Sequence, residues 1–361
     1  MNSGSPSFWQ SSWKRLKKNK GAMVGLFLIL AAIFIALFGY FLAPDASPYA
    51  NRIILEIGGE KPGYQRSFLL VKKDGAEKVG FFQRLLYGQP DLYEHIPIAS
   101  YQQKNDSFIV QKYIDEGVSE RLAVSQSKLA PVPIVTSTFH LGTDKYGRDI
   151  LSRLIIGTRI SLSVGLITVL ISLSVGMALG AIAGYFKGKA DEIIMWLINV
   201  IWSIPTLLLV FAITLLLGKG FWQVFIAVGL TMWVNVARLV RGQVMVTREL
   251  QYVEAGRVLG FSDSRIIIRH ILPNIMGPIL VIAASNFASA IVIEAGLSFL
   301  GVGVQPPMPS WGLMIKENYN FIITQNPMLA LAPGFAIMIL VLAFNLFGNG
   351  LRDALNVRGK L

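Results

Sequence analysis

Long stretches without a single charged residue restrict this 361-residue chain to few kinds of fold. The clearest of them, Gly21–Ala43, is apolar throughout. As a helix it would measure roughly 35 Å, at about 1.5 Å per residue, and would cross a hydrocarbon core of about 30 Å. Only 15% of the residues are charged, and the mean hydropathy is +0.55. These features predict an all-α polytopic membrane protein and argue against a water-soluble protein.

Six crossings are predicted in total, so both termini lie on the same side. After the basic N-terminus (1–20) and the first span (21–43), the further spans are predicted at residues 160–186, 193–217, 221–240, 275–300 and 328–348, followed by a tail at 349–361. A cleaved signal peptide is the alternative for the first span. Its apolar core is usually about 7–15 residues, which is shorter than this run. A retained anchor helix is therefore expected.

The charges predict which side is which. Residues 44–155 carry 14 Lys and Arg against 13 Asp and Glu, whereas the rest of the chain carries 19 against 8. The excess lies in short segments beside the apolar runs, the pattern of cytoplasmic loops in membrane proteins. The basic residues on the predicted inner side include Lys14, Arg15, Lys17, Lys18, Lys20, Lys187, Lys189, Arg238, Arg269, Arg352, Arg358 and Lys360, whereas one short outer connection has only Lys219. The termini are therefore expected in the cytoplasm, and a nucleic-acid-binding role is rejected.

Residues 44–140 differ from the rest because they are polar and balanced in charge. The stretch SFLLVKKDGAEKVGFF reads as two apolar runs around a turn at Asp74–Gly75. SFIVQKYIDEGVSERLAV repeats that plan around Asp115–Gly117. Both are typical of β-hairpins. We expect a small β-rich extracytoplasmic insertion between the first two spans, with a partly disordered loop as the alternative.

The stretch QYVEAGRVLGFSDSRIIIRHILPN, residues 251–274, is basic and segmented. Its first half predicts a short helix, and Gly260 suits the left-handed position after it, where a Cβ would be costly. Ser262 or Asp263 is expected to cap a second helix. Pro273 either ends that helix or begins the next span. The apolar stripe of the second helix comprises Ile267, Ile268, Ile271 and Leu272.

On the predicted cytoplasmic side, this stretch suits docking into the groove of a partner. The small pair Ala255–Gly256 lets another backbone approach closely. A helix-turn-helix DNA reader has a similar outline. Between two membrane spans, however, it has no room to enter a major groove.

The same stretch resembles the EAA loop of permease subunits in bacterial binding-protein-dependent ABC importers. That pattern is Glu-Ala-Ala, three residues, Gly, nine residues, and then Ile-x-Leu-Pro. Gly256 replaces the second Ala, and His270 replaces the first Ile. The matching residues are Glu254, Ala255, Gly256, Gly260, Ile271, Leu272 and Pro273. The resemblance implies that residues 241–274, here called the coupling loop, supply a coupling helix that sits in a cleft of an ATPase subunit.

Two further stretches are similar to the dipeptide, oligopeptide and nickel branch of this family, and to its oligopeptide/dipeptide C-type permease. They are LGTDKYGRDILSRLIIGTRISL (141–162) and EAGLSFLGVGVQPPMPSWG (294–312). In the first, Thr143 or Asp144 is expected to cap an amphipathic helix that lies along the outer interface over residues 141–159. The resemblance implies a type I ABC importer permease fold, but it says nothing about the long insertion.

Two residues inside spans are candidates for the transport pathway. Glu294 lies in an apolar span, where an unpaired charge is expensive. It either lines the pathway or acts as a fixed hydrogen-bonded cap for the Pro-rich outer loop, and the sequence favours neither. Pro205 is expected to kink the third span, which shapes either the pathway or the packing.

Signs of catalysis or metal binding are absent from the sequence. The Gly-Lys pairs 188–189, 218–219 and 359–360 are followed by Ala, Gly and Leu, whereas a phosphate loop needs Ser or Thr there. The three His residues are scattered, and there is no Cys. We therefore expect no catalytic residue, no metal and no cofactor bound by this chain. If ATP drives it, ATP and Mg²⁺ bind to partner ATPase subunits.

The resemblance implies an ABC importer permease of the bacterial inner membrane that carries short peptides. Its expected partners are a second, paralogous permease, two cytoplasmic ATPase subunits, an extracytoplasmic binding protein and the lipid bilayer, with a homodimer of this permease as the alternative. Nickel or another small solute is the alternative cargo. An ion-coupled secondary transporter is the alternative class, although it predicts inverted repeats and several midplane charges. A membrane-anchored scaffold would leave the coupling loop unexplained.

Overall fold

The computed structural model describes residues 8–104, 106–218, 220–323 and 326–355. It confirms a mostly helical membrane fold with a β-rich insertion between the first two spans. Lys219, Arg358 and Lys360, which the charge pattern assigned to loops and tail, lie outside the described residues. The chain forms two compact units. Unit 1 comprises Met1–Ala32, Ser161–Gln305 and Ile337–Leu361, and unit 2 comprises Ile33–Ile160 and Pro306–Ala336.

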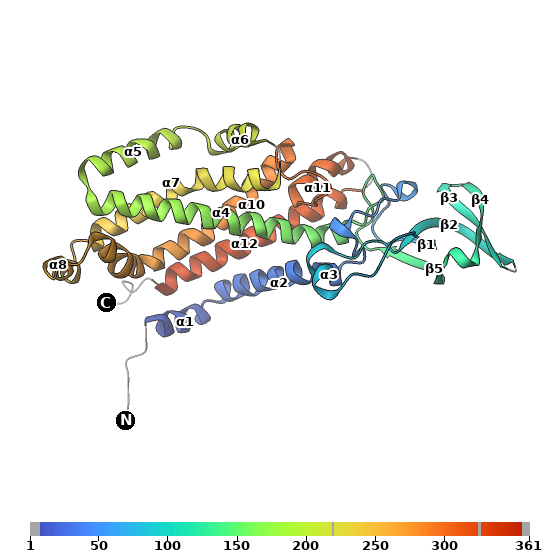
Figure 1. The fold of residues 1–361 in the computed structure, drawn as a ribbon, viewed down its shortest axis with the longest axis horizontal. Helices are drawn as coiled ribbons and strands as arrows, with labels where there is room; N and C mark the ends of the chain where they lie inside the picture. The colour runs from blue at the N-terminus through green and yellow to red at the C-terminus, as the bar shows by residue number, and fades with distance from the viewer. Residues whose placement is uncertain (1–7, 105, 219, 324–325, 356–361) are drawn as a thin grey trace, which may run out of the picture. The chain divides into compact units, whose positions relative to one another are not determined.

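The helices are labelled as in Figure 1. The α-helices are α1 (Phe8–Lys18), α2 (Lys20–Leu42), α3 (Phe81–Tyr87), α4 (Ile150–Phe186), α5 (Gly188–Trp202), α6 (Thr206–Leu217), α7 (Phe221–Thr247), α8 (Gln251–Val258), α9 (Asp263–Arg265), α10 (Met276–Leu300), α11 (Trp311–Asn318) and α12 (Met328–Leu355). A π-helical turn, Ile266–Ile271, and a 3₁₀ turn, Leu272–Ile275, connect α9 to α10. Shorter 3₁₀ turns are Pro48–Ala50, Leu55–Ile57, Gln126–Lys128 and Tyr319–Ile322.

Within the described residues, five helical segments are long and apolar enough to cross a membrane. They are Lys20–Leu42, Ile150–Phe186, Phe221–Thr247, Asp263–Leu300 and Met328–Leu355. A sixth crossing requires α5 and α6 together, and these two helices meet at an angle of 92°. The count of six therefore depends on a broken span.

The structure corrects two of the expected boundaries. The expected third span, 193–217, is a sharp break and not a kinked helix, because Pro205 lacks an N–H and disfavours helical backbone at the residue before it. The expected interfacial helix over 141–159 does not form separately, since α4 begins at Ile150 and continues without interruption to Phe186. Its cap is neither Thr143 nor Asp144. Instead, the carboxylate of Asp149 accepts a bond from the N–H of Ser152 at 2.8 Å.

In unit 1, small residues bring α4 and α7 close together. Gly176, Gly180 and Gly184 recur at every fourth position of α4, so they share one face. A Cβ at Gly176 would lie 2.5 Å from the Cβ of Val236, and one at Gly180 would lie 2.5 Å from a backbone oxygen of α7. This is the small-residue packing typical of membrane helices, where close backbone approach replaces the hydrophobic effect. Helix α10 also packs against α7.

In unit 2, five antiparallel strands form one sheet, in the order β4-β3-β2-β1-β5. The strands are β1 (Tyr64–Lys72), β2 (Tyr93–Lys104), β3 (Ser107–Asp115), β4 (Val118–Ser125) and β5 (Leu129–Phe139). Successive side chains of β1 point to opposite faces of the sheet. Phe68 packs with Ile57 and Phe139 on one side, whereas Leu69 packs with Phe108 and Val110 on the other. The insertion therefore has its own apolar core.

One of the two predicted hairpins exists. β3 and β4 are paired, and Gly117 in their turn has φ = 76°. The other prediction is wrong, because β1 pairs with β2 and β5, and the apolar run after Asp74–Gly75 forms the helix α3. Its sequence FFQRLLY places Phe81, Phe82 and Leu85 at helical spacing. The two apolar pairs, Phe81–Phe82 and Leu85–Leu86, are four residues apart, a spacing that indicates a helix and not a strand.

Candidate functional site

The coupling loop contains the short helix expected from the sequence. Glu254, Ala255 and Gly256 all lie in α8. Gly260 follows this helix with φ = 76°, which confirms the predicted left-handed position. The N–H of Phe261 bonds to the carbonyl of Gly256 at 3.0 Å, and the N–H of Gly260 bonds to that of Arg257 at 2.9 Å. This pair of bonds is a Schellman motif, which ends the helix and redirects the chain.

The second helix starts without the expected cap. Ser262 occupies the N-cap position, but its side chain accepts no capping bond. The carboxylate of Asp263 accepts a bond of 2.6 Å from the hydroxyl of Tyr185 instead. The prediction that one of them caps the helix is therefore wrong. Asp263 ties the coupling loop to the end of α4, a role that no local sequence pattern reveals.

Pro273 follows the π-helical turn and stands in the first turn of the next helical segment. It lies in the 3₁₀ turn between the π-helical turn and α10, so the helical path is continuous from Asp263 to Leu300. Irregular turns accommodate a residue that cannot donate a backbone hydrogen bond. The carbonyl of His270 accepts a bond of 2.6 Å from the side chain of Asn274. The end of the coupling loop is thus a direct extension of a membrane-spanning helix.

The two sides of the coupling loop differ in exposure. Gly256 is buried, and Ile271 and the half-buried Leu272 pack with Ile266 in a core that also contains Val253. By contrast, Val258 is 83% exposed and Leu259 is 71% exposed, and Glu254 and Ala255 are also exposed. The predicted stripe is only partly right, because Ile268 points outward. The loop therefore presents apolar side chains at its tip while its inner face is packed.

Charged residues that were not among the predicted site residues attach the coupling loop to the rest of unit 1. The guanidinium of Arg248 donates to the carbonyl of Tyr185. Lys187 pairs with Glu249 at 2.8 Å, and these side chains are 41% and 63% exposed. Arg241 forms a two-pronged ion pair with Asp191. These contacts join α7 to the connection between α4 and α5, and sequence reasoning missed them because the partners lie 50 to 63 positions apart.

Glu294 is completely buried in α10. Its carboxylate accepts a bond of 2.6 Å from the hydroxyl of Ser298, and that hydroxyl in turn accepts a bond of 3.0 Å from the N–H of Val304. These two hydrogen bonds connect the C-terminal end of α10 to the segment before the Pro-rich stretch. This arrangement agrees with the interpretation of Glu294 as a fixed cap, although its role in transport stays a prediction.

A cavity of about 190 Å³ lies beside the break between α5 and α6. Pro205 and Glu294 do not line it, but their neighbours Thr206 and Ile293 do. Its polar lining is uncharged and comprises Thr206, Thr231, Asn235 and Ser289, next to Trp202. These side chains can donate and accept hydrogen bonds without imposing a charge on a ligand.

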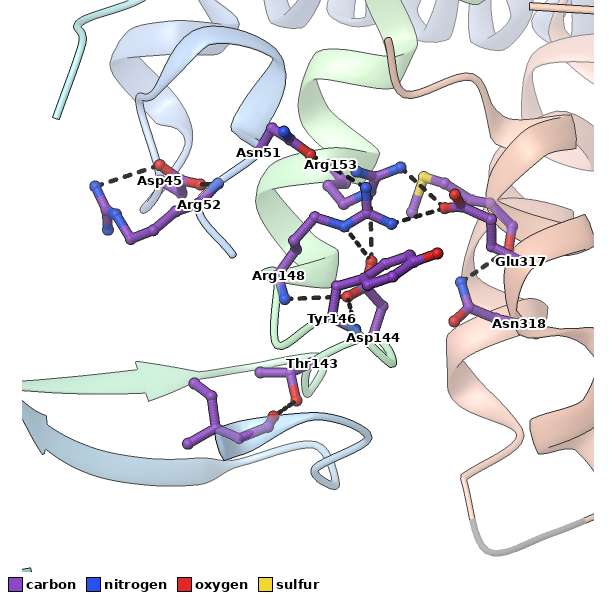
Figure 2. Close-up of polar contacts among 12 residues, drawn as sticks. Asp45, Asn51, Arg52, Thr143, Asp144, Tyr146, Arg148, Arg153, Glu317 and Asn318 are labelled. Atoms are coloured by element: carbon purple, nitrogen blue, oxygen red, sulfur yellow. Dashed lines mark hydrogen bonds and ion pairs between the residues drawn. The ribbon is translucent and has the colours of Figure 1, made fainter. Parts of the chain in front are cut away.

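A second polar arrangement, the buried charge cluster, lies in unit 2 and comprises Asp144, Arg148, Arg153 and Glu317. Asp144 pairs with Arg148 at 2.6 Å and accepts a bond from the N–H of Tyr146 at 2.9 Å. Glu317 of α11 approaches Arg148 at 2.8 Å and Arg153 at 3.2 Å. Figure 2 shows both guanidinium groups pointing toward Glu317. All four side chains are at most 11% exposed, so each charge depends on its partners.

Within the described parts of the chain, no three His, Asp or Glu side chains gather in a way that could hold a metal ion. The buried charge cluster contains two arginines, whose charges oppose cation binding.

Comparison with known proteins gives two family matches. The family described as "Binding-protein-dependent transport system inner membrane component" matches residues 176–359, which include the coupling loop. The family described as "N-terminal TM domain of oligopeptide transport permease C" matches residues 7–55.

Individual relatives cover different parts of the chain. The glutathione transport system permease protein GsiD of Pectobacterium atrosepticum is 44% identical over 225 residues, which are 62% of this chain and 74% of the relative. The oligopeptide transport system permease protein OppC of Bacillus subtilis is 41% identical over 215 residues, 60% of this chain and 70% of the relative. The dipeptide transport system permease protein DppC of Bacillus subtilis is 32% identical over 350 residues, 97% of this chain and 86% of the relative.

Proposed function

Because the chain belongs to the family of binding-protein-dependent transport system inner membrane components, we propose that it is the permease subunit of a bacterial ABC importer for short peptides. It is a non-catalytic, multi-pass subunit of the inner membrane with cytoplasmic termini. It works with a second, paralogous permease, two ATPase subunits that bind ATP and Mg²⁺, and an extracytoplasmic binding protein. The cargo class is supported by the dipeptide, oligopeptide and glutathione systems to which the relatives belong.

The observation that carries this proposal is the geometry of the coupling loop. Its exposed tip, Val258–Leu259, suits insertion into an apolar cleft of an ATPase subunit. The opposite end continues into α10, and Asp263 bonds to Tyr185 of α4. A displacement of the tip is therefore transmitted to two spans at once. ATP binding drives the exchange of inward-open and outward-open states if the ATPase contacts differ between them.

In this proposal, the cavity beside the α5–α6 break is this chain's contribution to the transport pathway. Peptides of different sequence share only their backbone amides and their termini. Uncharged groups such as Asn235 and Ser289 can bond to amides without selecting a side chain. The broken span also leaves backbone groups without helical partners, which is tolerated at membrane depth only where they are buried in protein or line a cavity.

Uptake by the reconstituted complex tests the function. The full complex in proteoliposomes, with its binding protein, should accumulate labelled di- and tripeptides only when ATP is supplied on the ATPase side. Accumulation of Ni²⁺ without peptide uptake would transfer the proposal to the metal-carrying branch. Uptake that follows an ion gradient and ignores ATP would replace the ABC mechanism by secondary transport.

The proposed orientation has its own test, because the chain contains no Cys. Ser262 and Ser100 are both exposed, so single Ser262→Cys and Ser100→Cys variants are suitable reporters. In intact spheroplasts, an impermeant thiol reagent should label position 100 and leave position 262 unlabelled until the membrane is permeabilised. The reverse pattern would invert the topology.

A further inference from the structure

The short helix α3 exposes more apolar surface than a helix of a water-surrounded domain should. Phe81, Leu86 and Tyr87 are more than half exposed, and Phe82 is 76% exposed. None of its seven residues is buried. The surrounding insertion is polar and balanced in charge, so this concentration of aromatic and aliphatic side chains requires a partner.

Helix α3 is fixed against the C-terminal end of the membrane-spanning helix α2. The rings of Phe81 and Phe41 are 5.3 Å apart, and the guanidinium of Arg84 lies 4.6 Å from the Phe41 ring. Gly88, directly after α3, packs so tightly that a Cβ there would lie 2.8 Å from the ring of Tyr40. Figure 1 shows α3 at this end of α2.

The C-terminal carbonyls of α3 are bonded in the same place. Arg159 of α4 donates to the carbonyl oxygens of Leu86 and Leu85 at 2.9 and 3.0 Å, and its guanidinium lies over the ring of Tyr40 at 5.6 Å. These bonds satisfy groups that a helix end leaves open, and a cation there complements the helix dipole. The exposed face of α3 is therefore held in a fixed position beside the C-terminal end of α2 and is not free to move into the insertion.

The exposed surface of α3 continues the exposed surface of α2. Phe34, Leu37 and Phe41 of α2 are all exposed, and only 17% of this span is buried within the structure. For a membrane span, such a surface faces lipid. Because the Phe41–Phe81 contact joins the two surfaces, the lipid-facing surface extends onto α3 where the span ends. That is the interfacial depth at which aromatic side chains are enriched.

We propose that α3 is a membrane-surface anchor, which inserts Phe81, Phe82, Leu86 and Tyr87 between the lipids of the leaflet at the C-terminal end of α2. The charge pattern predicts that this is the outer leaflet. With seven residues, α3 is roughly 10 Å long and lies in the interface without spanning it. Besides α2 and α4, the anchor gives the insertion a third point of attachment to the bilayer.

A fluorescent probe on single cysteines tests this anchor in the assembled complex. Phe82→Cys is the reporter, Leu37→Cys on the exposed face of α2 is the lipid reference, and Glu116→Cys in the β3–β4 turn is the water reference. Each is labelled with an environment-sensitive dye and placed in nanodiscs that contain phosphatidylcholine with spin-labelled acyl chains. Position 82 should show blue-shifted emission and should be quenched by shallow spin labels, whereas position 116 should show neither effect.

Two results would overturn the proposal. Emission at position 82 as red as that at position 116 would mean that α3 faces water. Blue-shifted emission that no spin-labelled lipid quenches, while position 37 is quenched, would mean that a protein partner covers α3. Phe82 is 76% exposed and its ring contacts that of its neighbour Phe81, so its replacement removes little internal packing and the chain should still fold.

Discussion

The coupling loop and the buried charge cluster hold their surroundings by opposite means. The coupling loop relies on a backbone motif at Gly260 and on partly or largely exposed polar contacts, such as Lys187 with Glu249. The buried charge cluster relies on ions that are almost completely removed from solvent. An exposed ion pair can break at little cost, whereas a buried charge that loses its partner is strongly destabilising. The first arrangement suits a part that moves, and the second suits a part that must not.

The largest expected effect follows from removing a charge from the buried charge cluster. Glu317→Gln removes the carboxylate that Arg148 and Arg153 share, and breaking a buried pair in this way costs about 3–5 kcal/mol. We expect a large fall in the melting temperature of the purified complex and in the amount of chain recovered from membranes. Arg153→Met in the same background should recover part of this loss, because it removes the charge that was left unpaired. If Glu317→Gln alone is as stable as the parent, the buried charge cluster does not hold its surroundings rigid.

A smaller but functionally sharper effect is expected at Gly260. Valine there must adopt the left-handed backbone region, which costs about 1–2 kcal/mol and re-aims the second half of the coupling loop. The Gly260→Val chain should reach the membrane and assemble, yet ATP hydrolysis should lose its stimulation by the loaded binding protein. Gly260→Asn is the matched control, since Asn tolerates this region. Equal stimulation in both variants would show that the bend has no part in coupling.

The insertion should lose stability in mild acid. Burial, followed by the positive charge of Arg52, lowers the pKa of His95 on β2 to about 4. The ordinary pKa of a histidine is about 6.5. Below this pH, His95 binds a proton in the unfolded insertion but not in the folded one, so the insertion loses stability between about pH 6.5 and about pH 4. Hydrogen exchange, corrected for intrinsic rates, should show the sheet loosening over this range while α7 is unchanged. His95→Gln should flatten the response, and an identical response in that variant would assign it to other groups.

The smallest effect is expected at Glu249. Its pair with Lys187 is largely exposed, and such pairs contribute little because water and salt screen them. Glu249→Gln should leave the melting temperature and the uptake rate indistinguishable from those of the parent. A loss comparable to that of Glu317→Gln would remove the contrast between the two regions.

The sequence by itself determined features that depend on neighbouring residues. Apolar runs predicted the spans, and the coupling loop with its left-handed Gly260 follows from a local requirement of the backbone. The β3–β4 hairpin was predicted for the same reason, since its turn and both strands lie in one stretch. Where local signals conflicted, the prediction failed. The apolar run after the Asp74–Gly75 turn suggests the second strand of a hairpin, although its four-residue spacing is helical.

Tertiary structure alone decided which distant groups meet. Asp263 could have capped its own helix, but the hydroxyl of Tyr185, 78 positions away, is its partner. Glu317 lies 169 positions from Arg148, so no spacing rule could connect them. A kink at Pro205 could be predicted from the sequence, but the angle of 92° between α5 and α6 could not. Backbone preference is set within a few residues, whereas the partner of a buried charge is set by packing, which brings together whichever segments can exclude water from it.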